Sequence, residues 1–195
     1  MDLIDLIQEK RFLGQEFLAW LWFKSEERGG SVEVPGRGDV LVVFEKHMLL
    51  EYGEGDANEK VICRGLQTEL KEARAGLGLA KKPEQARIRL GWGDHEFGVT
   101  LAAATLEFRN VRLPKTVDSS DEGRDAESLE GRLLERIGLF ELLARLVDDL
   151  FALFINIRAS HLWNDELVRL RAWTNAGAHQ AQPSPPRLHP WNSKP

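Results

Sequence analysis

Cysteine is almost absent from this chain: its 195 residues include only Cys63. A single cysteine excludes a disulfide framework and a cysteine-based zinc site within one chain, and it fits a reducing cytosol. The first residues carry acids before any basic group and too short an apolar run, so we expect neither a signal peptide nor a membrane span. Net positive charge is also missing, since the formal charge is −5. Contact with nucleic acid would therefore need a local basic face.

Familiar catalytic motifs are absent as well. The sequence has no Walker-type loop, dinucleotide fingerprint, GxSxG elbow or zincin helix. The loop at residues 36–39 has two glycines and an arginine that could touch a phosphate, but a turn before a strand is the better interpretation. We therefore nominate no catalytic residue, no metal ligand and no cofactor.

The composition is otherwise that of an ordinary soluble globular protein, with 43% hydrophobic and 29% charged residues. The length suits one domain, or one domain with appendages, and it is sufficient to bury a hydrophobic core without disulfides or structural metals. Aromatic residues are concentrated near the start, in FLGQEFLAWLWFKSEE at residues 12–27. This block predicts a helix that has apolar side chains around most of its circumference and ends at Gly29 and Gly30. We expect a separate short helix before Gly14. The main role expected of the aromatic block is core packing, with Trp20 and Phe23 as the side chains best placed to reach a partner.

The next segment changes to the period of β-strands. Residues 40–44 and 48–52 predict two strands joined by a tight hairpin at residues 45–47, and Val61 begins a third strand. A short helix is expected at residues 66–77. This segment therefore predicts an antiparallel meander followed by a helix.

A second group of strands is expected before residue 114. Residues 86–90 and 97–101 alternate apolar and polar side chains around a turn at residues 92–95. A further strand continues through Leu106, and a shift in its apolar phase predicts a β-bulge near Asn110. The sequence leaves open whether the two groups of strands form one sheet or two sheets.

The last third of the chain predicts helices. An acidic linker precedes a long helix at residues 128–158, about 45 Å in length at ~1.5 Å per residue, and a short helix follows at residues 164–173. We thus predict an α+β fold: antiparallel sheet, an aromatic N-terminal helix and a long C-terminal helix. The expected organisation is a helix and β-rich region at 1–114, a linker at 115–127, a helical region at 128–174 and a disordered, proline-containing tail at 175–195.

Basic residues gather between residues 81 and 115, where seven positive groups face four acids. Arg87 and Arg89 share one face of their strand, and later basic residues lie nearby across the expected bulge. Such a row could contact a phosphate backbone. From the sequence alone, a solvated sheet face with cross-strand pairs such as arginine with Glu96 is the stronger interpretation. Our candidates for DNA contact are Arg87, Arg89, Arg109, Arg112 and Lys115.

Acids and histidines offer a weaker alternative. Asp148 and Asp149 are adjacent on the long helix, but neighbouring helical positions point about 100° apart and do not form a compact pair. His161 lies near Asp165 and Glu166 in sequence, but a metal or acid–base site needs several such groups to converge in space. Solvated surface residues are the stronger interpretation.

Four blocks of the sequence resemble segments in divergent members of the recombination-associated RdgC family of bacteria. The aromatic block at 12–27 is the most distinctive. The others are VTLAAATLEFRNVRLP, EGRLLERIGLFELLARLVDDLFALFINIRAS and WNDELVRLRAWT, so the resemblance covers residues 12–174 as a pattern of blocks. The chain is shorter than a typical member and matches only its later part.

The resemblance implies a nonenzymatic, nucleoid-associated protein of the cytoplasm that modulates recombination. It implies binding to duplex DNA without sequence preference, by a homodimer. The family's DNA-contact residues do not carry over one by one, so the five basic residues rest on electrostatics alone. Two other functions remain open: a protein-interaction or assembly subunit that uses wide apolar helix faces, and, ranked last, a metal-dependent hydrolase or nuclease using Asp148 or the His161, Asp165, Glu166 cluster.

Overall fold

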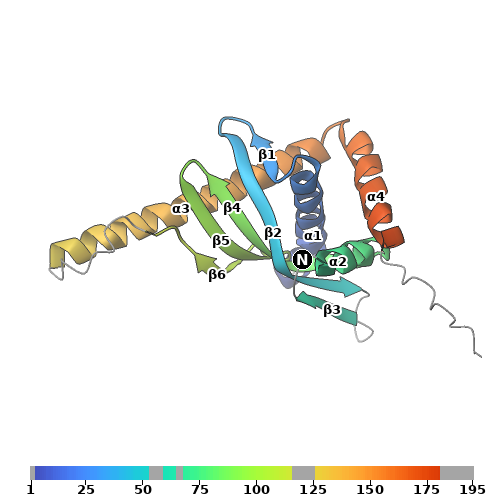
Figure 1. The fold of residues 1–195 in the computed structure, drawn as a ribbon, viewed down its shortest axis with the longest axis horizontal. Helices are drawn as coiled ribbons and strands as arrows, with labels where there is room; N and C mark the ends of the chain where they lie inside the picture. Colours follow the sequence, from blue (N-terminus) through green and yellow to red (C-terminus); the bar gives the residue numbers. More distant parts are fainter. Residues whose placement is uncertain (1–2, 53–58, 65–67, 116–125, 181–195) are drawn as a thin grey trace, which may run out of the picture.

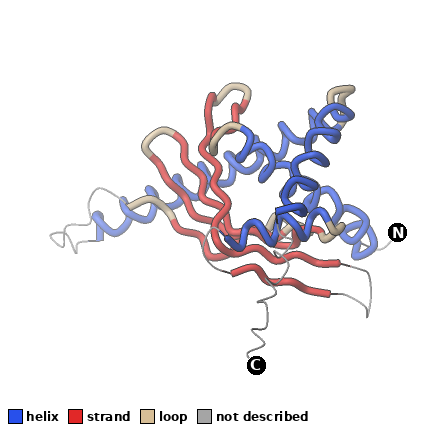
Figure 2. Tube along the Cα trace, turned by 45° about the vertical axis from the view of Figure 1, so that its right-hand side comes forward, coloured by secondary structure: helices blue, strands red, loops and turns tan. Residues whose placement is uncertain are grey.

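A computed structural model of the protein describes residues 3–52, 59–64, 68–115 and 126–180. Within these ranges the helices gather on one face of a single antiparallel sheet (Figures 1 and 2), which confirms the α+β class. The helices are α1 (Leu3–Glu27), α2 (Thr68–Gly78), α3 (Ala126–Arg158) and α4 (Trp163–Gln180). The strands are β1 (Ser31–Val34), β2 (Gly38–Tyr52), β3 (Glu59–Arg64), β4 (Lys82–Trp92), β5 (His95–Ala102) and β6 (Phe108–Arg112).

Helix α1 runs unbroken through Gly14, so the expected pair of shorter helices is wrong. A Cβ atom at Gly14 would lie 1.7 Å from the carbonyl oxygen of Ala103, in the turn after β5. Gly14 therefore lets the helix approach the sheet rather than ending it. The helix ends where expected, because Gly29 and Gly30 adopt positive φ angles of 63° and 100°.

Strand β2 is one strand of 15 residues, and the hairpin expected at residues 45–47 is wrong. One edge of β2 pairs with β4 from Leu41 to Glu51, with register shifts between Phe44 and Met48 and between Leu49 and Leu50. Its other edge pairs first with β1 and then with β3. The polar residues between the two apolar runs therefore form an irregularity inside a strand, and the hairpin lies earlier, between β1 and β2.

Strands β4, β5 and β6 follow the sequence prediction, except that β6 begins at Phe108 and Leu106, expected within the strand, lies before it with a positive φ of 54°. β4 and β5 pair in continuous register from Gln85 with Ala102 to Trp92 with His95. Between β5 and β6 the register moves from Thr100 opposite Arg109 to Gly98 opposite Arg112, which confirms the bulge near Asn110. All strands join one sheet in the order β1-β2-β4-β5-β6, with β3 beside β2.

The hydrophobic core lies between the helices and the inner face of the sheet. Trp20 is fully buried and Phe23 is only 5% exposed, so the expectation that they reach a partner is wrong. The Trp20 and Phe17 rings pack against Phe154 of α3, with ring centroids 5.5 and 5.7 Å apart. The aromatic block is thus the anchor that joins α1 to α3.

Helix α3 has 33 residues, about 50 Å at ~1.5 Å per residue, and its first turns extend past β5 and β6 (Figure 1). Helix α4 continues to Gln180, so residues 175–180, expected in a disordered tail, are helical. The rest of that tail, at 181–195, and most of the expected linker, at 116–125, lie outside the described residues. Among the helices described, none combines the length and apolarity needed to cross a membrane.

Candidate functional site

The outer face of the sheet, away from the helices, carries a hollow of about 530 Å³. It forms because side chains alternate along a strand: Ile88 and Leu90 of β4 are buried, so Arg87 and Arg89 point outward. Four of the five candidate basic residues converge here, and Arg109 does not line the hollow. The residues that line it are Glu45, Arg87, Arg89, Asp94, Glu96, Gly98, Arg112, Leu113, Pro114 and Lys115.

Gly98 lies at the centre of the hollow, between two arginines. In the sheet register, Gly98 of β5 is opposite Arg89 of β4 on one side and Arg112 of β6 on the other. A Cβ atom at Gly98 would meet the side chains of Arg87 at 3.2 Å and Arg112 at 3.4 Å. The missing side chain therefore leaves room above β5 for the side chains of Arg87 from β4 and Arg112 from β6 to come together.

Arg87 is fixed by neighbours on three strands. Its Nε donates a hydrogen bond to Glu45 Oε2 at 3.0 Å, and its Nη1 donates to the carbonyl oxygen of Asn110 at 3.1 Å. Nη1 also lies 3.4 Å from Thr100 Oγ1. Arg87 therefore holds the β6 bulge against the sheet, and much of its charge is already balanced.

Arg89 is held more loosely. Its side chain is 41% exposed, with Nη1 3.7 Å from Glu96 Oε1 and Nε 4.0 Å from Glu45 Oε1. The Nε atom is buried and has no hydrogen-bond partner among the described residues. Within those residues neither Arg112 nor Lys115 has an ion pair. The hollow therefore contains cationic groups with unused hydrogen-bonding capacity.

Arg109 is directed away from these groups by a local partner. Its Nη2 lies 2.7 Å from Glu107 Oε2, and its Nε donates to the same oxygen at 3.2 Å. The hydrogen bond from Arg109, with its positive charge, lowers the pKa of the Glu107 carboxyl below its usual value. The reciprocal interaction raises the pKa of Arg109. Arg109 therefore belongs to a surface ion pair.

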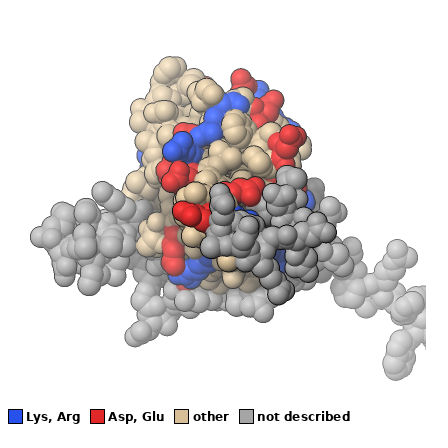
Figure 3. Space-filling view, turned by 90° about the vertical axis from the view of Figure 1, so that its left-hand side faces the viewer, with Lys and Arg blue, Asp and Glu red and all other residues tan. Residues whose placement is uncertain are grey.

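Acidic side chains offset much of the positive charge of the hollow. Its lining has four basic residues and three acids, Glu45, Asp94 and Glu96. In Figure 3, basic and acidic side chains interleave on the side of the molecule that is at the left of Figure 1. The charge is thus a local cluster of cations with counter-ions and not a continuous basic strip.

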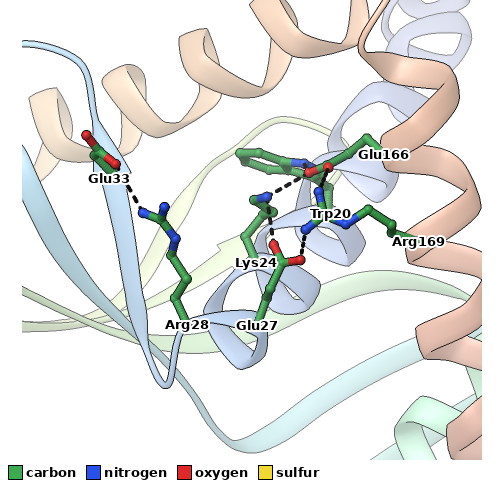
Figure 4. A network of polar contacts seen from close by, with 7 residues as sticks. All are labelled: Trp20, Lys24, Glu27, Arg28, Glu33, Glu166 and Arg169. Atoms are coloured by element: carbon green, nitrogen blue, oxygen red, sulfur yellow. Dashed lines mark hydrogen bonds and ion pairs between the residues drawn. The ribbon is translucent and has the colours of Figure 1, made fainter.

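A second polar cluster lies between α1 and α4 and has a structural role (Figure 4). Glu166 Oε1 accepts a hydrogen bond from Trp20 Nε1 and forms an ion pair with Lys24 Nζ, both at 3.0 Å. Glu166 Oε2 accepts from Arg169 Nη1, also at 3.0 Å. Its carboxylate is therefore fully engaged in joining two helices.

The proposed catalytic acids do not form a site in the described part of the chain. His161 and Asp165 are exposed, whereas Glu166 is buried in its ion-pair cluster. Asp149 forms an ion pair with Arg37, and Asp148 is exposed. Across the described residues, no group of three or more histidine, cysteine, aspartate or glutamate side chains could hold a metal ion.

Comparisons with known proteins leave the resemblance to RdgC untested. No protein-family model matches the chain, and no curated protein or solved structure is significantly similar to it. The case for a function therefore rests on the geometry of the outer sheet face.

Proposed function

We propose that the protein is a nonenzymatic DNA-binding protein that holds the phosphates of duplex DNA in the hollow on the outer sheet face. The observation that carries the proposal is the row formed by Arg89, Gly98 and Arg112. Neighbouring strands are about 4.8 Å apart, so the backbones of Arg89 and Arg112 are roughly 10 Å apart. The guanidinium of Arg87 lies between them, close to Gly98. That spacing suits two long side chains that close on one phosphate, with Lys115 at the rim.

Binding of this kind needs no sequence preference. Contacts to phosphates position a protein on a duplex, whereas sequence is read from base edges in the grooves. The candidate groups are arginines and one lysine, which suit phosphate oxygens in number and charge. A role in recombination and a nucleoid location are supported by the resemblance alone.

The acids in the hollow limit the expected affinity for DNA. Glu45 and Glu96 compete with phosphate for Arg87 and Arg89, so affinity should be modest and sensitive to salt. Each neutralised phosphate contributes about −0.9 to the slope of log K against log salt, so one phosphate between Arg89 and Arg112 and a second at Lys115 give about −1.8. A slope of this size would distinguish phosphate binding from an apolar contact.

Fluorescence anisotropy with a labelled duplex at low salt tests the proposal. We expect unrelated duplexes of equal length to bind alike, and the double variant Arg89→Glu, Arg112→Glu to lose binding. The control is Arg28→Glu with Arg171→Glu, which changes net charge equally at exposed sites outside the hollow. Absence of binding by the unmodified chain, or equal loss in both double variants, would contradict the proposal.

A further inference from the structure

Helices α1, α2 and α4 come together on the helix side of the sheet (Figure 1), and a cleft with mostly apolar walls lies between them and the start of β4. Its volume is about 270 Å³. The apolar part of the wall is formed by Phe12, Ala19, Leu77, Ala80, Pro83 and Leu170. Because an apolar cavity of about 150 Å³ holds one benzene ring, this cleft has room for a ligand of roughly ten carbon atoms.

Contacts between elements hold the walls of the cleft in place. Gln15 of α1, which is only 8% exposed, forms part of the wall and donates a hydrogen bond to Glu84 of β4. Arg74 Nε of α2 donates to the carbonyl oxygen of Trp173 in α4 at 2.8 Å. The cleft is thus formed before any ligand enters, and binding requires little ordering of the protein.

The charged side chains of the cleft favour an anion. Lys82 is exposed and has no ion pair with any described residue, whereas Lys81 beside it already has an interaction of its own. The acid in the lining, Glu16, is paired with Arg158 of α3. Lys82 therefore offers an ammonium group that is not neutralised to the polar end of a ligand that fills the cleft.

Ala80 brings a methyl group to the cleft at a position where glycine is the usual residue. It follows the end of α2 with a φ of 62°, in the left-handed conformation that ends many helices. The turn is closed by hydrogen bonds from the Ala80 N–H to the Leu77 carbonyl at 3.1 Å and from the Lys81 N–H to the Gly76 carbonyl at 3.0 Å. Alanine is less stable than glycine in this conformation, so the methyl group lowers stability while it adds apolar surface to the wall. Residues held in this way are common at ligand sites.

We propose that the cleft binds a small carboxylate with an apolar body of roughly ten carbon atoms, which is the chemistry of a medium-chain fatty acid. The chain lies against Phe12, Leu77 and Leu170, and the carboxylate pairs with Lys82. Phe12 is 42% exposed, so the chain covers apolar surface that otherwise faces water. Binding here is independent of the proposed DNA contact, because the cleft and the hollow share no lining residue.

Isothermal titration calorimetry of the full chain with straight-chain carboxylates from hexanoate to dodecanoate tests the size of the cleft. Titrations at two temperatures detect binding through its heat-capacity change even where the enthalpy is small. Each added CH₂ group should strengthen binding about fourfold, and the gain should stop near decanoate because the cleft is then full. No binding by any of these acids, or a gain that continues unchanged through dodecanoate, would overturn the proposal.

Filling the cleft with a side chain tests where the ligand lies. Ala19 is half-buried and lines the cleft, so the ring in Ala19→Phe takes space from the ligand. Octanoate binding should fall more than tenfold, because the loss of two buried CH₂ groups costs about fourfold each. The matched control is Ala152→Phe on α3, which makes the same change at an exposed helical position outside the cleft and should leave binding unaltered. Equal affinities for the two variants would contradict the proposed location.

The charge of the ligand is tested at Lys82, an exposed residue whose replacement leaves the core intact. Lys82→Met should weaken octanoate binding about twofold to fivefold, the range of an exposed ion pair, and should leave the binding of 1-octanol unchanged. The alcohol is the control, because it has the same chain without the negative charge. A similar change for both ligands, or for neither, would show that the carboxylate does not meet Lys82 and would overturn the assignment of an anionic ligand.

Discussion

Trp20 Nε1 donates a hydrogen bond to Glu166 Oε1 at 3.0 Å across 146 positions of the sequence, and neither residue is exposed. The contact joins the aromatic helix to the last helix at a point where Lys24 and Arg169 also bind the carboxylate. Trp20 is fully buried, so its N–H loses its acceptor when Glu166 is removed. This contact gives the first test of the fold.

We expect Glu166→Ala to lower the free energy of unfolding by about 2–3 kcal/mol, because it leaves the buried N–H of Trp20 unpaired. Glu166→Gln should cost less, since an amide oxygen can still accept that hydrogen bond. The control is Glu135→Ala at an exposed position on α3, expected to change stability by no more than about 0.5 kcal/mol. Urea unfolding followed by tryptophan fluorescence measures all three. Equal losses at residues 135 and 166 would refute the role assigned to Glu166.

Two glycines in helices should respond oppositely to the same substitution. Gly138→Ala meets nothing within 4 Å and should stabilise the protein by about 0.5–1 kcal/mol through helix propensity. Gly14→Ala brings a Cβ atom 1.7 Å from the Ala103 carbonyl oxygen, so α1 must move away from the sheet. We expect that change to cost about 2 kcal/mol or more, as for other overpacked sites. Thermal unfolding should show a higher midpoint for one variant and a lower one for the other. If Gly14→Ala is also stabilising, the close approach of α1 is wrong.

Gly14 also illustrates how far local sequence signals can predict the fold. The periodicity of residues 12–27, 86–101 and 128–158 predicted the aromatic helix, the β4–β5 pair and the long helix. A glycine needed for close packing has the same local signal as a glycine that breaks a helix, because the difference lies in the distant Ala103. Likewise Glu45–His47 resembles a hairpin turn, and only pairing with β1, β3 and β4 makes β2 a single strand.

The same limit applies to the candidate site. Strand alternation was enough to predict that Arg87 and Arg89 share a face, and the bulge at Asn110 brings Arg112 beside them. Glu45 was missed as a counter-ion because it was assigned to a turn. Gly98 was missed because its role depends on register with two other strands. The sequence predicted the pairing of an arginine with Glu96, which Arg89 forms, but it did not predict the pairing of Arg87 with Glu45.

The ion pair of Glu107 and Arg109 predicts a pH response that does not depend on any ligand. The hydrogen bond and charge of Arg109 lower the pKa of Glu107, so Arg109→Gln should raise that pKa toward its usual value. For a lowered carboxyl pKa, the pair's contribution to stability is present above the unfolded pKa and is lost as pH falls through the folded pKa. A carboxyl ¹³C NMR titration of both proteins measures the shift, with Glu130, exposed on α3, as the internal reference. An unchanged Glu107 pKa would show that Arg109 does not control it.

The acids in the hollow predict variants that bind DNA more tightly than the unmodified chain. Glu96 lies 3.7 Å from Arg89 and is 61% exposed, so it competes with phosphate for that guanidinium. We expect Glu96→Gln to strengthen binding about twofold to fivefold, as an exposed ion pair is worth roughly 0.4–1 kcal/mol.

Glu107→Gln is the matched control for this change, because it removes the same charge at a similarly exposed carboxylate that does not line the hollow. It should strengthen binding less, and only through net charge. Anisotropy titrations at several salt concentrations separate the two effects, since long-range repulsion is screened more strongly by salt than a contact within 4 Å. Equal gains from both variants would mean that phosphates do not enter the hollow, and the DNA-binding face would have to lie elsewhere on the molecule.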